Sequence, residues 1–195
     1  MRSVRNYINT DGTTNIKSTF LSCEKDYALI IEKLFIENKQ WARELKKLLV
    51  INTKDCLDNP KYNDIVDKMS VADLVEQGYI RFTPKISLGE HEEVKSYLMI
   101  SFDNFLPSDN PQFRDNIVHF NIICHTNYWE LGDYRLRPIK IAGYVDGILN
   151  NAKLTGIGIL NFLACAQLLL NEEFSGYTLD YVAVHGNDDY IHNED

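Results

Sequence analysis

The sequence has little of the chemistry that marks a metal centre, a disulfide scaffold or a nucleotide site. Its four cysteines are scattered and form no CxxC pair, so neither a zinc site nor a disulfide framework is indicated. The stretch TGIG at 155–158 lacks both the Lys-Ser/Thr ending of a phosphate loop and the full dinucleotide glycine pattern. We therefore predict no metal ion and no cofactor.

Long apolar runs are also missing. The longest, at 157–170, is interrupted by Asn161 and Gln167 and is too short to span a bilayer. The first residues lack the apolar region of a secretory signal. We therefore expect synthesis in the cytoplasm and no membrane partner.

Basic residues are scarce beyond the first quarter of the chain. Residues 1–54 carry ten basic and six acidic side chains, whereas residues 55–195 carry ten basic and twenty-two acidic ones, giving a net charge of −8. Phosphate binding depends on clusters of Lys and Arg, so an acidic body argues against wrapping nucleic acid. The two parts are expected to face different surroundings.

No set of residues in the sequence forms a recognisable catalytic centre. Cys124 and His125 are neighbours at a strand end and should point to opposite faces, which prevents a nucleophile–base pair. The segment GEHEE at 89–93 has the composition of an exposed loop. A polar C-terminal group has metal-ligand types without a recognised spacing: His185, Asp188, Asp189 and His192. We predict no catalytic residue and a non-enzymatic protein.

The N-terminal part has the periodicity of helices. Apolar residues recur at helical spacing before and after an expected break near Asn38. Ser70 and Asp73 have the spacing of a capping box, which indicates a short helix ending at Gly78. The two apolar stripes comprise Tyr27, Ile30, Ile31, Leu34 and Phe35, then Trp41, Leu45, Leu48 and Leu49.

Strands are predicted in the rest of the chain. The segments at 79–84, 96–102, 117–125 and 178–185 are rich in β-branched and aromatic residues and are separated by polar loops. A helix is predicted at 138–150 from apolar spacing. The fold class that follows is α+β, with an antiparallel sheet packed against helices and an N-terminal helical part.

The segment at 157–170 can be read in two ways. Its composition favours a helix, yet it precedes NEEFSGY, which is suited to turn the chain into the strand at 178–185. The residues alone leave helix and strand open.

The start of the helix at 138–150 carries charge of the wrong sign. Unpaired N–H groups make a helix N-terminus partly positive, yet Arg135, Arg137 and Lys140 surround this one. The arginines must therefore interact with something outside their own helix.

The order of segments resembles the neck proteins of tailed bacteriophages, which include head-tail connector, tail-completion and tail-terminator subunits. The similarity covers roughly residues 75–188. It rests on an ordered series of phrases: VHFNIICHTNYW, RLRPIKIAGYVDGILNN, LTGIG and FSGYTLDYVAVHGNDD. The resemblance implies a virion protein, made in the host cytoplasm, that forms a ring joining capsid and tail. It also implies that 157–168 is a strand paired with 178–186.

In such a ring, basic groups on one flank meet acidic groups of the next subunit. The resemblance therefore implies a subunit interface formed by Tyr128, Trp129, Arg135 and Arg137. Its other implied partners are neck, portal or tail proteins, and DNA that passes through the channel without specific binding. The alternative is that Arg135 and Arg137 pair within their own loop, with Asp133 or Glu130.

The expected organisation has four parts: an arm at 1–20, a helical part at 21–78, an α+β core at 79–186 and an acidic tail at 187–195. Two other functions stay open. One is a small cytosolic enzyme whose site is assembled from distant residues, and the other is an adaptor whose N-terminal helices bind a partner protein.

Overall fold

The computed structural model describes residues 23–83, 94–107, 114–154 and 157–185. The predicted arm at 1–20, the segment at 89–93 and the acidic tail at 187–195 lie outside the described residues. Within the described part of the chain, no helix is both long and apolar enough to cross a membrane.

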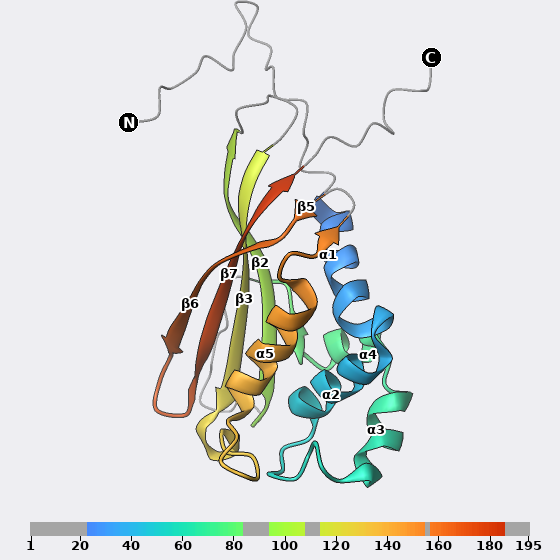
Figure 1. The fold of residues 1–195 in the computed structure, drawn as a ribbon. Helices are drawn as coiled ribbons and strands as arrows, with labels where there is room; N and C mark the ends of the chain where they lie inside the picture. The colour runs from blue at the N-terminus through green and yellow to red at the C-terminus, as the bar shows by residue number, and fades with distance from the viewer. Residues whose placement is uncertain (1–22, 84–93, 108–113, 155–156, 186–195) are drawn as a thin grey trace, which may run out of the picture.

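A five-stranded sheet forms the centre of the fold (Figure 1). Its order is β1-β2-β3-β7-β6, and all neighbours are antiparallel except β1 and β2. The strands are β1 (Ile80–Arg81), β2 (Ser96–Pro107), β3 (Arg114–His125), β6 (Asn161–Leu169) and β7 (Phe174–His185). A small separate ladder joins β4 (Lys153–Leu154) to β5 (Gly158–Ile159). The predicted α+β class is confirmed.

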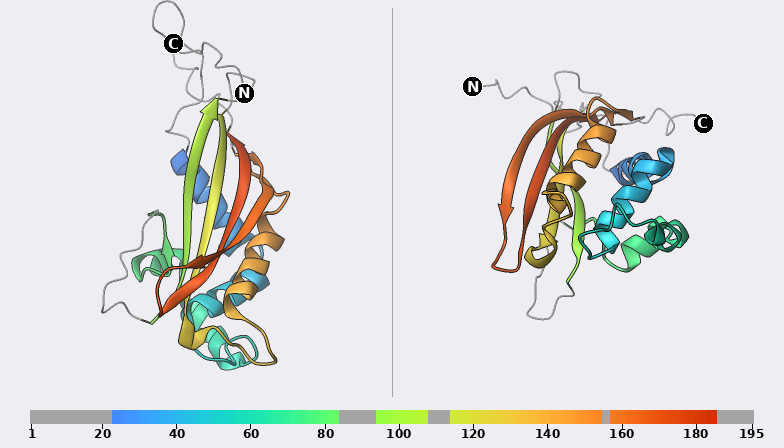
Figure 2. Two further views of the ribbon diagram at one scale, coloured as in Figure 1. Left: turned by 90° about the vertical axis from the view of Figure 1, so that its left-hand side faces the viewer. Right: turned by 60° about the horizontal axis from the view of Figure 1, so that its bottom comes forward.

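Helices make the second layer. Helix α5 (Arg137–Leu149) lies along one face of the sheet over β3 and β7, and α2 (Lys39–Val50) lies beside α5 (Figures 1 and 2). The remaining helices are α1 (Cys23–Glu32), α3 (Asn63–Lys68) and α4 (Val71–Glu76). η2 (Lys33–Glu37) is a short π-helix, and η3 (Pro60–Tyr62) and η4 (Thr126–Tyr128) are short 3-10 helices.

The helix boundaries follow local signals in the sequence. The break at Asn38 is real, and the Asn38 side chain accepts a hydrogen bond from the backbone N–H of Trp41 at 3.2 Å, which caps α2. Ser70 and Asp73 form the reciprocal capping box that their spacing predicts. Gly78 then takes a positive φ of 77°, which turns the chain from α4 into β1.

The core between the layers confirms the predicted faces. Alternate residues of β3 are buried against α5. Helix α5 contributes buried apolar residues spaced four apart to the same core. From β3 these are Val118, Phe120, Ile122 and Cys124, and from α5 they are Ile141, Val145 and Leu149. A smaller cluster covers one end of the other sheet face, with Tyr97, Met99, Ile123 and Phe174.

The ambiguous segment at 157–170 contains strands. β6 pairs with β7 from Asn161 opposite Val182 to Leu169 opposite Ser175. The helix propensity of this segment is overridden because the antiparallel ladder satisfies its backbone groups on one side. The pairing of 157–168 with 178–186 that the resemblance implied is confirmed for residues 161–166, which pair with residues 178–182. Residues 158–159 pair instead with β4, and residues 167–169 pair with 175–177.

Candidate subunit-contact surface around the start of helix α5

Arg137 is the largest fully buried side chain of the described protein, with no exposed surface. Its guanidinium donates to four backbone carbonyl oxygens. Nε donates to Tyr128 at 2.8 Å, and Nη2 donates to Thr53 at 2.8 Å. Nη1 donates to Leu48 at 2.6 Å and to Ile51 at 2.9 Å. The buried charge is therefore held by backbone dipoles.

Two of these carbonyls explain the arginine at the start of α5. Leu48 lies in the last turn of α2, and Ile51 is its C-cap residue. The last carbonyls of a helix lack partners inside the helix and give its C-terminus a partial negative charge. Arg137 belongs to α5 in sequence but stabilises the C-terminus of α2.

Arg135 forms an ion pair within the protein. Both of its terminal nitrogens contact the carboxylate of Asp58, and Asp133 lies 3.6 Å from Nη2. The hydrogen bond to Asp58 is the main reason that the pKa of Arg135 is raised. Glu130, the other loop acid considered, pairs instead with Lys54 at 2.8 Å.

These positions correct part of the predicted interface. Arg137 is enclosed in its own protomer, so its side chain does not reach a neighbouring subunit. Arg135 pairs with Asp133, as the alternative expected, and also with Asp58 from a distant loop. Tyr128 and Trp129 are half-buried, and Trp129 Nε1 donates to the carbonyl of Cys124 at 3.3 Å.

The fully exposed aromatic residue of this loop is Tyr134, which sequence analysis did not single out. Asp133 and Tyr134 have positive φ values of 58° and 59°. Such conformations are unfavourable for residues with a Cβ and commonly persist where a loop has a role in contact. The strained turn presents the Tyr134 ring to solvent.

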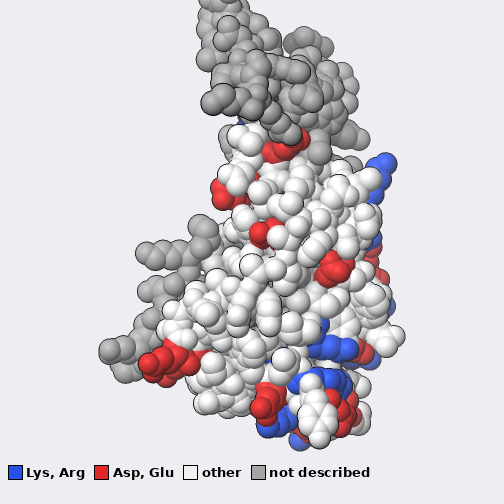
Figure 3. Space-filling model, turned by 60° about the vertical axis from the view of Figure 1, so that its left-hand side comes forward, with Lys and Arg blue, Asp and Glu red and all other residues white. Residues whose placement is uncertain are grey.

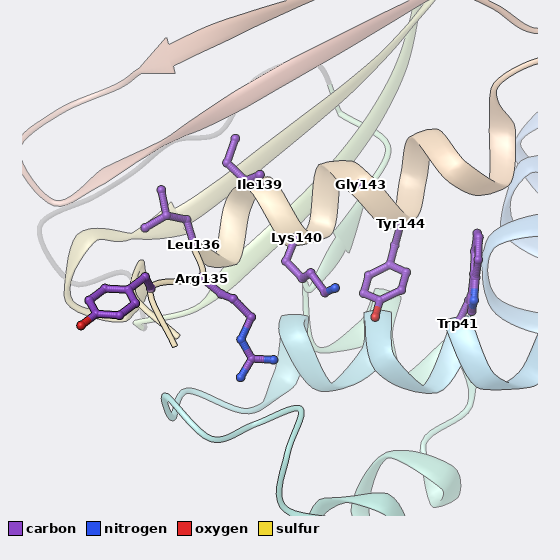
Figure 4. A pocket seen from close by; sticks show the side chains of 8 residues that line it. Trp41, Arg135, Leu136, Ile139, Lys140, Gly143 and Tyr144 are labelled. Atoms are coloured by element: carbon purple, nitrogen blue, oxygen red, sulfur yellow. The ribbon is translucent and has the colours of Figure 1, made fainter. Parts of the chain in front are cut away.

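A groove of about 510 Å³ runs beside this turn, between α2 and α5. Figure 4 shows Lys140 and Tyr144 projecting from α5 on the side of α2, where Trp41 stands. The Trp41 and Tyr144 rings meet edge to face with centroids 6.0 Å apart, and Lys140 Nζ lies 5.1 Å from the Tyr144 ring centre. The other lining residues are Tyr134, Arg135, Leu136, Ile139 and Gly143. Aromatic residues and arginine are enriched at protein contact surfaces.

A second surface lies over β6 and the start of α5. Side chains on both faces of β6 are exposed, with Leu169 at 73%. On the face that Figure 3 shows, charged side chains are sparse across the middle of the surface. The exposed large apolar residues here are Leu136, Ile139, Phe162, Leu163, Leu169 and Leu170.

The positions of Cys124 and His125 do not suit a nucleophile–base pair. Cys124 is fully buried, and burial raises the pKa of its thiol to about 11, so the nucleophilic thiolate is suppressed. The neighbouring His125 ring instead accepts from the backbone N–H of Asn127. In the described residues, no group of three His, Cys, Asp or Glu side chains is positioned to hold a metal ion.

One row of polar residues crosses the opposite sheet face. Ser101, His119 and Asp180 occupy paired positions on β2, β3 and β7. His119 Nδ1 lies 2.7 Å from Asp180 Oδ1, and Asp103 lies 3.8 Å from Nε2. A serine hydrolase would need its nucleophile hydrogen-bonded to the histidine. Nε2 of His119 faces Asp103 and not a serine, so this row reads as a cross-strand hydrogen bond between His119 and Asp180.

Comparison with known proteins places the chain in a family. The family model YomW matches residues 42–183, which include most of α2, nearly all of the sheet and the whole of α5. The chain belongs to the YomW family. This family is phage-associated. No curated protein matches the chain.

One solved structure similar to this YomW-family chain comes from the "Virion of native gene transfer agent (GTA) particle". The two share 16% sequence identity and align over 62% of this chain and 87% of the other, with a TM-score of 0.38. A similarity this distant carries no weight for the function of the YomW-family chain.

A signal for the burial of Arg137 was present in the sequence of this YomW-family member. A spacing of four places Arg137 on the same helix stripe as Ile141, Val145 and Leu149, which is the face buried in the core. The exposure of β6 had a weaker signal, since its lack of charge fits a buried segment equally well.

Proposed function

We propose that this chain is a structural subunit of a phage virion, where it assembles with copies of itself and with other virion proteins. Its membership of a phage-associated family supports this proposal. The ordered layout of segments resembling phage neck proteins supports it independently.

The observation that carries an assembly role is the uncovered apolar surface over β6 and the start of α5. Monomeric proteins rarely leave a large contiguous apolar patch in water, and such patches mark contact sites. Here the exposed leucine, isoleucine and phenylalanine side chains come from β6, the residue after it and the start of α5. A chain that remained single would leave this surface in contact with water.

The specific form that we propose is a homo-oligomeric ring of the neck, of the tail-terminator or tail-completion type, joining capsid and tail. Its neighbours would be other neck, portal or tail proteins. The excess of acidic residues beyond residue 54 suits a channel through which DNA passes without binding, because like charges repel phosphate.

Within such an assembly, the loop before α5 and the α2–α5 groove form another contact surface, which shares Leu136 and Ile139 with the β6 surface. Tyr128, Trp129 and Arg135 each keep part of their side chains exposed. Tyr134 joins them as the most exposed aromatic group. We propose that this loop meets another protein chain, with aromatic rings as anchors.

Mass spectrometry of purified particles of the phage or prophage that encodes this chain tests the proposal. The chain should be present in intact particles at a fixed number of copies per particle. A mutant lacking the gene should give heads and tails that fail to join. Infectious particles that lack this chain would show that it is not a subunit of the virion.

A further inference from the structure

Strand β6 is an unprotected sheet edge. Among the described residues, β6 pairs only with β7, so one side of its backbone carries N–H and C=O groups without a partner strand. Its nine residues contain no Asp, Glu, Lys or Arg, and no proline. Such an edge is a template for pairing with another strand.

The other edge of the same sheet is protected. β1 has only two residues and covers β2 at Leu98 and Met99. Further along β2, the ladder with β3 has an irregularity between Asp103 and Leu106, and Asn104 has a positive φ of 53°. Short edge strands, charges and bulges prevent edge-to-edge pairing. β6 has an irregularity of its own only near its start, between Phe162 and Ala164, and is regular from Ala164 to Leu169. The chain thus hinders strand addition at the β2 edge and permits it along this part of β6.

The composition of β6 suits a second copy of this chain. The protein carries a net charge of −8, so two copies repel each other overall. β6 carries no charge, so two β6 strands can approach without like charges facing. The blocked β2 edge makes β6 itself the available strand on the second copy.

We propose that β6 pairs in antiparallel fashion with β6 of a second copy, around a two-fold axis at Cys165. Cys165 is the midpoint of Asn161–Leu169 and lies within the regular part of β6, which begins at Ala164 after an irregularity in the β6–β7 ladder. This register places Ala164 opposite Ala166 of the partner. The two sheets then form one continuous ten-stranded sheet. This contact rests on the proposed self-assembly and specifies where it occurs. Since the contact is two-fold, it joins copies related by a two-fold axis and not the head-to-tail neighbours within one ring, and any closed assembly containing it has an even number of subunits.

Cys165 itself reports on this contact. It is exposed, whereas Cys56 and Cys124 are buried, and the remaining cysteine is removed by Cys23→Ser. Residues directly opposite in an antiparallel pair have Cα atoms about 5 Å apart, within reach of a disulfide or a short bismaleimide. Burial, Asp180 and Asp146 raise the pKa of Cys165, so the reaction is run at about pH 9.

We expect the Cys23→Ser protein to convert to a covalent dimer within its native assembly. The Cys23→Ser, Cys165→Ser double variant should give none under the same conditions. Absence of cross-linking in a protein that is nevertheless oligomeric would overturn the β6–β6 pairing.

A charge exchange at the axis tests the symmetry. Cys165→Lys places two like charges opposite each other, so association should weaken by about tenfold or more. Cys165→Asp should do the same, whereas an equal mixture of the two variants should recover association. The matched control is Ile65→Lys, an exposed apolar residue on α3, which should associate as the unmodified protein does. Circular dichroism verifies that all the variants fold.

Two outcomes separate this inference from the proposed function. If Cys165→Lys assembles as the unmodified protein does and the mixture shows no recovery, the contact lies elsewhere while self-assembly stands. If the unmodified chain stays monomeric at every concentration, both the self-assembly and the β6 contact are wrong.

Discussion

Nη1 of Arg137 and the carbonyl oxygen of Leu48 lie 2.6 Å apart although 89 residues separate them in the sequence. This hydrogen bond joins the first residue of α5 to the last turn of α2. The two arginines at the start of α5 therefore differ in their roles. Arg137 links α5 to α2 inside the protein, whereas Arg135 lies near the surface and pairs with Asp58. The first prediction tests this division.

Replacement of Arg137 by Lys should destabilise the protein by about 3 kcal/mol. An ammonium group keeps the charge but cannot reach four carbonyls arranged around a planar fork, and buried acceptors left without donors are costly. Urea unfolding followed by circular dichroism measures the change. Arg135→Ala is the control and should cost at most about 1 kcal/mol, because an exposed ion pair contributes little. Equal losses in both variants would contradict the assigned roles.

Gly176 in β7 should tolerate no side chain. A Cβ at this position would lie 1.7 Å from the carbonyl oxygen of Ile122 on β3. Gly176→Ala should therefore cost about 3 kcal/mol or more, or prevent folding. Gly143→Ala provides the contrast, because a Cβ there meets nothing within 4 Å in an exposed part of α5. It should stabilise the protein by about 0.5–1 kcal/mol, as judged by thermal unfolding.

Val145→Asp should abolish folding or cost several kcal/mol. Val145 is fully buried between α5 and the sheet, and a carboxylate there would lack a partner. Soluble Val145→Asp protein with a cooperative unfolding transition near that of the unmodified chain would refute the packing of α5 described above.

Stability should fall at alkaline pH. Burial raises the pKa of Cys124 to about 11, and burial together with the hydrogen bond to Asp146 raises the pKa of Tyr181. The folded state therefore keeps protons that the unfolded state releases, and its stability decreases as pH rises above about 9. Each group contributes up to about 1.4 kcal/mol per pH unit in this range. Urea midpoints at pH 7, 9 and 10 measure the slope, which Cys124→Ala should reduce.

Local patterns in the sequence predicted much of this fold. The break at Asn38, the capping box at Ser70, the alternating face of β3 and the buried stripe of α5 all depend on neighbours within a few residues. Short-range signals of this kind specify secondary structure and which face is buried. The short helix α3 was missed because six residues carry too little periodicity.

The contact surface could not be predicted in the same way. The burial of Arg137 depends on carbonyls contributed by α2 and the loop after it, far away in sequence. The exposure of β6 depends on its place at the sheet edge, which no local pattern specifies. The sequence correctly predicted that the arginines at the start of α5 interact with a group outside that helix. For Arg137, this group is the C-terminus of α2 in the same chain and not a neighbouring subunit.

The mass of the purified full-length protein in solution tests the central claim most directly. Sedimentation velocity over a wide concentration range, combined with electron microscopy of the same sample, gives subunit number and shape. We predict a discrete assembly that persists on dilution and has an even number of subunits, because the β6 contact joins copies in two-fold pairs. A protein that sediments as a monomer of 22.6 kDa at every concentration would contradict the account.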